Sequence, residues 1–114
     1  MTEKPKIEQP KIHSKPQNIT TQAGLPVTLS CYVEGNFSHH WVEWMTQNTT
    51  IHKGEEYSIS TSPSFKSTNG TNHYLTIHKL KTSGQYHCQV YNISEKIVDQ
   101  VTHQVLVDNG MIHH

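Results

Sequence analysis

Apolar residues alternate with polar ones in short runs along most of this chain. The clearest run places Val27, Leu29, Cys31 and Val33 at every second position. A period of two predicts a β-strand that turns one face into a core. Similar runs predict strands over residues 41–45, 74–78, 85–91 and 98–107, and weaker runs predict strands over 11–13, 19–22 and 57–60.

No stretch of the chain repeats its apolar residues with a helical period, and clusters of Asn, Gly, Ser, Thr and Pro separate the runs. Seven or eight short alternating strands are typical of a two-sheet antiparallel β-sandwich. We therefore expect one all-β domain over residues 10–108. A polar, flexible leader is expected over residues 1–9, and a short tail over 109–114.

The alternation also assigns side chains to the two faces of each strand. The expected core contains Leu29, Trp44, Leu75, Ile77 and Tyr86, with Val101, Val105 and Val107 in the last strand and His103 as an imperfect member. The expected outer set on two other strands is Trp41, Glu43, Met45, His87, Gln89 and Tyr91.

Charge and hydropathy narrow the classes of partner. Nine basic and nine acidic residues give a formal charge of zero, so nothing directs the chain toward nucleic acid or an anionic membrane. No apolar run approaches the roughly 18 to 20 residues that cross a bilayer. We expect no direct membrane contact by this fragment.

The residues that commonly carry catalysis form no recognisable grouping. The ten histidines are scattered without the spacing of a zinc site, and we expect them to be ordinary solvated side chains. No nucleophile, base and acid grouping or glycine-rich phosphate loop can be assembled. The sequence predicts no enzyme, no cofactor and no metal.

Two segments carry a resemblance to a known family. The segment Leu80 to Cys88 places a Ser-Gly pair before Tyr-x-Cys, and Gly24 to Cys31 reads Gly-Leu-Pro-Val-Thr-Leu-Ser-Cys. They resemble the strand E to F corner and the entry to strand B of the immunoglobulin superfamily. The 57 positions between the cysteines favour an intermediate-set or short variable-like domain. Thr82 stands where the family usually has Asp, and the last strand lacks a Gly-x-Gly bulge.

The resemblance implies roles for several residues. Cys31 and Cys88 would form an inter-sheet disulfide rather than remain two buried free thiols. The Tyr86 hydroxyl would reach upstream backbone and lock the corner. Trp44 is the candidate for the indole that packs on the disulfide, because it keeps the inward alternation, although Trp41 competes on spacing alone.

Five asparagines fit the N-glycosylation sequon: Asn18, Asn36, Asn48, Asn69 and Asn92. Asparagine also favours turns, yet five sequons at loops and strand margins predict a glycoprotein of the secretory pathway. The resemblance would gather Asn36, Asn69 and Asn92 at one end of the sandwich. Sugars there would crowd the loops and leave a sheet face as the accessible surface.

The outer set of six residues is the candidate partner-binding face, because Trp, Tyr and Met concentrate in interface cores. The alternative is that a further strand or the 36–40 loop covers it. The favoured function is protein recognition by a cell-surface receptor of the immune or adhesion kind, binding a protein ligand or counter-receptor. A spacer module, a secreted or viral decoy, and a homo- or heterodimer through a sheet face are the alternatives.

Overall fold

The computed structural model describes residues 10–35, 40–63 and 70–108. These residues form strands and connecting turns, with no helix in the described part. The strands are β1 (Lys11–Ile12), β2 (Asn18–Gln22), β3 (Val27–Glu34), β4 (His40–Thr46), β5 (Thr49–Thr50), β6 (Tyr57–Pro63), β7 (Gly70–Ile77), β8 (Gly84–Asn92) and β9 (Ile97–Asp108).

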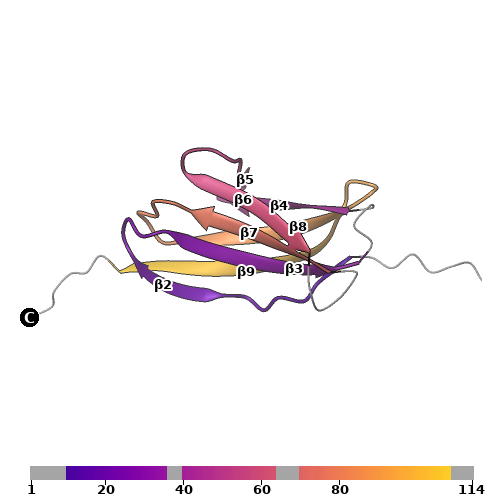
Figure 1. Cartoon of the computed structure of the whole chain (residues 1–114), viewed down its shortest axis with the longest axis horizontal. Coiled ribbons are helices and arrows are strands. Elements are labelled where there is room, and N and C mark those ends of the chain that lie inside the picture. Colours follow the sequence, from indigo (N-terminus) through magenta and orange to yellow (C-terminus); the bar gives the residue numbers. More distant parts are fainter. Residues whose placement is uncertain (1–9, 36–39, 64–69, 109–114) are drawn as a thin grey trace, which may run out of the picture.

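The strands make two sheets that lie along the long axis of the molecule (Figure 1). One sheet has the order β1-β3-β7-β6, and the other has the order β2-β9-β8-β4-β5. All strand pairs are antiparallel except β2 with β9, which run parallel along one edge. The predicted all-β sandwich is confirmed, with this one parallel pair as an addition that alternation could not reveal.

The core lies between the sheets and consists of the inward positions of alternating strands. Strand β3 shows the pattern most clearly, since Val27, Leu29, Cys31 and Val33 are buried and the residues between them are not. All five predicted core residues are buried: Leu29, Trp44, Leu75, Ile77 and Tyr86. Burial of this apolar surface is the main favourable term in folding such a domain.

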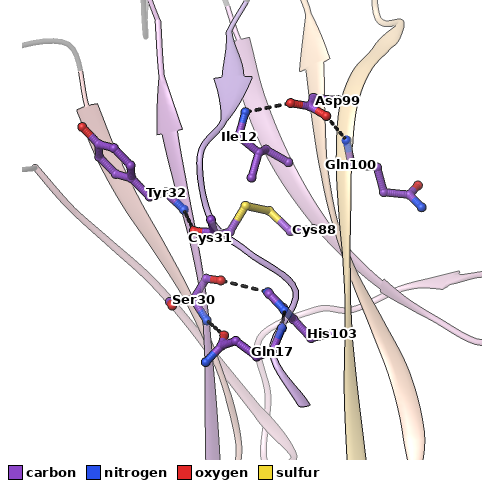
Figure 2. The surroundings of a disulfide bond; sticks show 10 residues. Ile12, Gln17, Ser30, Cys31, Tyr32, Cys88, Asp99, Gln100 and His103 are labelled. Carbon is purple, nitrogen blue, oxygen red and sulfur yellow. Dashed lines mark hydrogen bonds between the residues drawn. A yellow bond between two sulfur atoms is a disulfide. The ribbon is translucent and has the colours of Figure 1, made fainter. Parts of the chain in front are cut away.

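A disulfide between Cys31 on β3 and Cys88 on β8 joins the two sheets (Figure 2). The Cα atoms are 6.5 Å apart, within the usual range for such a bond. Trp44 lies opposite Cys88 in the β4–β8 register and is 1% exposed, whereas Trp41 is 39% exposed. The structure thus places Trp44, and not Trp41, beside the disulfide.

The corner before β8 is held by backbone and serine contacts. The Gly24 amide donates to the Leu80 carbonyl at 2.8 Å, and the Val107 amide donates to Ser83 Oγ at 2.8 Å. These two bonds hold the corner, and the contact expected from the Tyr86 hydroxyl to upstream backbone stays a prediction. Burial, followed by the proximity of Tyr57, raises the pKa of Tyr86.

His103 of β9 forms hydrogen bonds with the segment that connects β1 to β2 and with β3 (Figure 2). The Gln17 amide donates to His103 Nδ1 at 2.8 Å, so the proton is on Nε2, which donates to the Ser30 carbonyl at 2.9 Å. Gln17 Oε1 in turn accepts from the Ser30 amide. His103 is 0% exposed, in agreement with its place as an imperfect member of the expected core, so the general expectation of solvated histidines is wrong here. Satisfied hydrogen bonds on both nitrogens make its burial tolerable.

Candidate binding face

The outer side of strands β4 and β8 brings the six predicted face residues into three cross-strand rows. Trp41 pairs with Tyr91, Glu43 with Gln89, and Met45 with His87. Residues paired in this way share one face of the sheet. Strand β5 extends this sheet beside β4 rather than covering it. The face is therefore open within the described part of the chain.

Trp41 and Tyr91 form a parallel aromatic stack. Their ring centroids are 5.4 Å apart and their planes are inclined by 2°. Aromatic pairs in this range add stability beyond the area that they bury. The stack holds the indole in one orientation while leaving more than a third of Trp41 in solvent. A rigid exposed aromatic surface of this kind is suited to protein contact.

The Glu43 carboxylate is the acidic group of this face. The Tyr91 hydroxyl donates to Gln89 Oε1 at 3.0 Å, and Glu43 is its second polar neighbour. Burial, hydrogen bonding with Glu43 and the negative charge of Glu43 together raise the pKa of Tyr91. The phenol is protonated at neutral pH and donates its hydrogen bond to Gln89.

The remaining polar residues are tied to β9. Gln89 Nε2 donates to Gln100 Oε1 at 2.7 Å, and His87 Nδ1 shares a 2.8 Å hydrogen bond with Thr102 Oγ1. These bonds hold side chains that we expected to be available to a partner. They leave Trp41 and Glu43 as the main candidates for contact with a partner.

Strand β9 adds residues that the face assignment missed. Gln100 and Thr102 lie in the same rows as Gln89 and His87, and Ile97 lies opposite Tyr91 next to a β-bulge. Ile97 is 50% exposed, so the apolar part of the face continues from Trp41 across Tyr91. The alternation of residues 98–107 could have placed Gln100 and Thr102 outward, but the bulge breaks the period between Ile97 and Asp99.

Comparison with known proteins decides the family. The profile of the immunoglobulin I-set domain matches residues 10–105. The chain belongs to this family. No curated protein sequence matches it.

Several solved structures similar to this I-set domain are titin domains. Domain I10 of titin superposes with a TM-score of 0.65 at 21% identity, covering 89% of this chain and 100% of that one. The titin kinase with its flanking domains gives a TM-score of 0.70 at 18% identity, covering 87% of this chain and 17% of that one. Identities this low establish the shared fold and leave function to the site.

Three of the five sequon asparagines of the I-set domain lie in the described residues. Asn18 is exposed at the start of β2, and Asn48 is exposed in the two-residue turn between β4 and β5 with a φ of 60°. Asn92 ends β8, where its Oδ1 accepts bonds from the amides of Ser94 and Lys96. These bonds use the carbonyl oxygen and not Nδ2, the atom to which a sugar is joined. Asn36 and Asn69 lie outside the described residues.

A second histidine also lies inward. His73 on β7 pairs with Cys31, and its ring stands edge-on to that of His40 at a centroid distance of 6.5 Å. Its Nε2 is buried without a hydrogen-bond partner in the described part. Burial and the neighbouring His40 lower the pKa of His73 to about 4, and burial lowers that of His103. The expectation of solvated histidines is therefore also wrong for His73.

Acid is expected to destabilise this I-set domain through His73. In the unfolded chain His73 binds a proton as the pH falls below the ordinary histidine pKa of 6.5. In the folded chain it binds that proton only near pH 4. Stability is therefore full above about pH 6.5 and falls as the pH drops through that window. The free energy of unfolding should be about 1 to 2 kcal/mol lower at pH 5 than at pH 7. Urea unfolding at both pH values measures this difference.

His73→Phe is the matched variant for the acid effect, because the Nε2 atom has no partner to lose. It should reduce the pH dependence of stability and leave the part that His103 contributes, while His52→Gln at an exposed position should leave the pH dependence unchanged. A slope that His73→Phe does not alter would show that other groups cause the acid effect.

The described residues contain no group of three or more His, Cys, Asp or Glu side chains that could hold a metal ion. The His40 and His73 pair supplies two nitrogens, and structural zinc sites use four ligands. No helix capable of spanning a membrane occurs in residues 10–35, 40–63 and 70–108.

Proposed function

We propose that this I-set domain is a protein-recognition module of a glycosylated cell-surface receptor, acting in immune or adhesion contacts. Its binding surface is the outer face of β4, β8 and β9. The observation that carries the proposal is the exposed, stacked pair of Trp41 and Tyr91. Tryptophan and tyrosine are the residue types that dominate binding energy at interfaces.

The extracellular placement rests on covalent chemistry. Disulfides persist in oxidising compartments and are rare in the cytosol, and the Cys31–Cys88 bond spans the core of the domain. Asn18 and Asn48 are exposed sequon asparagines, as N-glycosylation requires. Together these features favour passage through the secretory pathway.

A spacer module in a multi-domain protein is the second candidate. It is favoured by the outer face of the other sheet, where hydroxyl side chains such as Thr28 and Thr76 bond to one another at 2.9 Å. In the described residues, the ring contact on the outer face of this sheet is the tilted pair of His13 and Tyr32 and not a parallel stack, so the face suits solvent. The two candidate functions predict different effects of replacing Trp41 on binding to a partner.

Trp41→Ala should weaken binding by about 2 kcal/mol or more, roughly 30-fold, with little change in thermal stability. Fluorescent tetramers of the domain, titrated on a panel of human and insect cell lines, measure the apparent affinity. Tyr74→Ala is the matched control, because Tyr74 lies on the outer face of the opposite sheet. Equal staining by wild type and Trp41→Ala on every line that binds would reject this face and favour the spacer.

Expression through a mammalian secretory pathway should give a broad, heavy species. Enzymatic removal of N-linked sugars should reduce it toward the 13.0 kDa of the polypeptide. Single Asn18→Gln, Asn48→Gln and Asn92→Gln variants should each remove one step of mass on a denaturing gel. A sharp band at the polypeptide mass before deglycosylation would contradict the proposed localisation.

A further inference from the structure

We propose that the binding face receives a basic side chain, a guanidinium group, from a protein other than a second copy of this chain. The receiving site is Trp41, Tyr91 and Glu43. The inference rests on the proposed function and adds the chemical class of the partner's central residue.

The three residues form an electronegative aromatic corner. Trp41 and Glu43 are two positions apart on β4, so both lie on the outer face, and Tyr91 stacks on Trp41 from the neighbouring strand. A cation over an indole face is attracted by the ring quadrupole, and tryptophan is the strongest of the aromatic acceptors. A carboxylate one row away supplies a charge-assisted hydrogen bond to the same cation.

No cation of the described chain neutralises Glu43. The ion pair found among the described residues joins His13 to Glu34, on the other sheet. On the strands, the outward residues that surround the corner are neutral or aromatic, apart from the His87 ring that is bonded to Thr102. Lys96 precedes Ile97, which lies opposite Tyr91, and it is found in no ion pair with Glu43 among the described residues. A partner that covered Glu43 with apolar surface would leave a buried, unpaired charge, which is strongly unfavourable. A productive partner must therefore bring a positive group to this position.

A second copy of the chain is a poor source of that group. The chain has nine lysines and no arginine, and none of the nine lies within β4, β8 or β9. Lys96, in the turn before β9, is the lysine nearest to the face along the chain. Two copies meeting through this face would set the two Glu43 carboxylates in the same interface. A guanidinium suits the corner better than an ammonium because its planar group stacks on an indole and binds carboxylate through two N–H groups.

The test uses the intact domain labelled with ¹⁵N and the probe N-acetyl-arginine amide, with N-acetyl-citrulline amide as its neutral counterpart. The indole N–H resonance of Trp41 should shift on titration with a millimolar dissociation constant, while that of buried Trp44 should not. Glu43→Gln should weaken binding of the arginine probe at least 5-fold. In Trp41→Ala the probe should no longer shift the resonance of the neighbouring Tyr91 amide. Glu55→Gln, an exposed acid in another segment, is the matched control and should change nothing.

The outcomes separate this inference from the proposed function. Equal shifts of the Trp41 indole resonance with the citrulline and arginine probes would overturn cation recognition. So would an unchanged affinity of Glu43→Gln for the arginine probe. Either result would leave Trp41 as a contact residue. Absence of any Trp41 shift would also overturn it, whereas the proposed function depends on the cell-staining result. A concentration-dependent dimer that Glu43→Gln or Lys96→Gln disrupts would show that a second copy occupies the face.

Discussion

Replacing Cys31 and Cys88 together by alanine is expected to lower the free energy of unfolding by about 4 kcal/mol. The bond closes a loop of 57 positions, and on the chain-entropy model the main effect of losing it is a more disordered unfolded state. Urea denaturation of the oxidised wild type and of the double variant measures the difference. A small domain has a net stability of 5 to 15 kcal/mol, so the loss is a large fraction of it.

Reduced wild type is the control for the cysteine experiment, because it breaks the bond without removing the sulfur atoms from the core. Both forms should unfold at similar, lower urea concentrations. A difference below about 1 kcal/mol between oxidised and reduced protein would contradict a stabilising role for the bond. Two free thiols in secreted, folded protein would also remove the main argument for an oxidising compartment.

Trp44→Ala is expected to destabilise the domain by about 3 to 5 kcal/mol. The indole is 1% exposed, lies opposite Cys88 in the register, and is 6.1 Å from the ring of His103 between centroids. Its removal leaves a cavity that the two sheets, fixed by the disulfide, can fill only in part. Thermal and urea unfolding of the oxidised variant measure the loss.

Two matched variants are compared with Trp44→Ala in their effect on stability. Trp41→Ala removes the same side chain from the outer face, and the loss of its stack on Tyr91 should lower stability by only about 1 kcal/mol. Trp44→Phe should cost less than Trp44→Ala, because the phenyl ring fills part of the space that the indole occupied. Neither variant loses a hydrogen bond of Nε1, which has no partner in the described structure. Greater damage from Trp41→Ala than from Trp44→Ala would mean that strand β4 faces the opposite way, and the proposed binding face would fall with that register.

The two experiments on tryptophan also separate stability from recognition. Trp44 acts through the core and Trp41 through the surface, although they lie three positions apart on one strand. A binding defect in a variant that keeps its unfolding free energy can be attributed to the face. This separation matters for Glu43→Gln, whose effect must be electrostatic if the cation inference holds.

The amino-acid sequence by itself determined most of the strands, their inward faces and the superfamily, while it missed the short strand β5 and left two sets of the superfamily open. Alternation is a local property, since successive side chains of a strand point to opposite faces. The pattern around Trp44 therefore distinguished it from Trp41 without any knowledge of neighbouring strands. The Cys31 and Cys88 motifs then indicated which two strands face each other across the core.

Only the tertiary structure decided which distant residues meet. His103 is buried because Gln17 and Ser30, 86 and 73 positions away, satisfy both of its ring nitrogens, and no local pattern carries that information. The stack of Trp41 on Tyr91, the engagement of Gln89 by Gln100, and the parallel pairing of β2 with β9 arise from strand order and register. Those features follow from contacts between segments far apart in the chain, and such contacts exist only when the whole sandwich has formed.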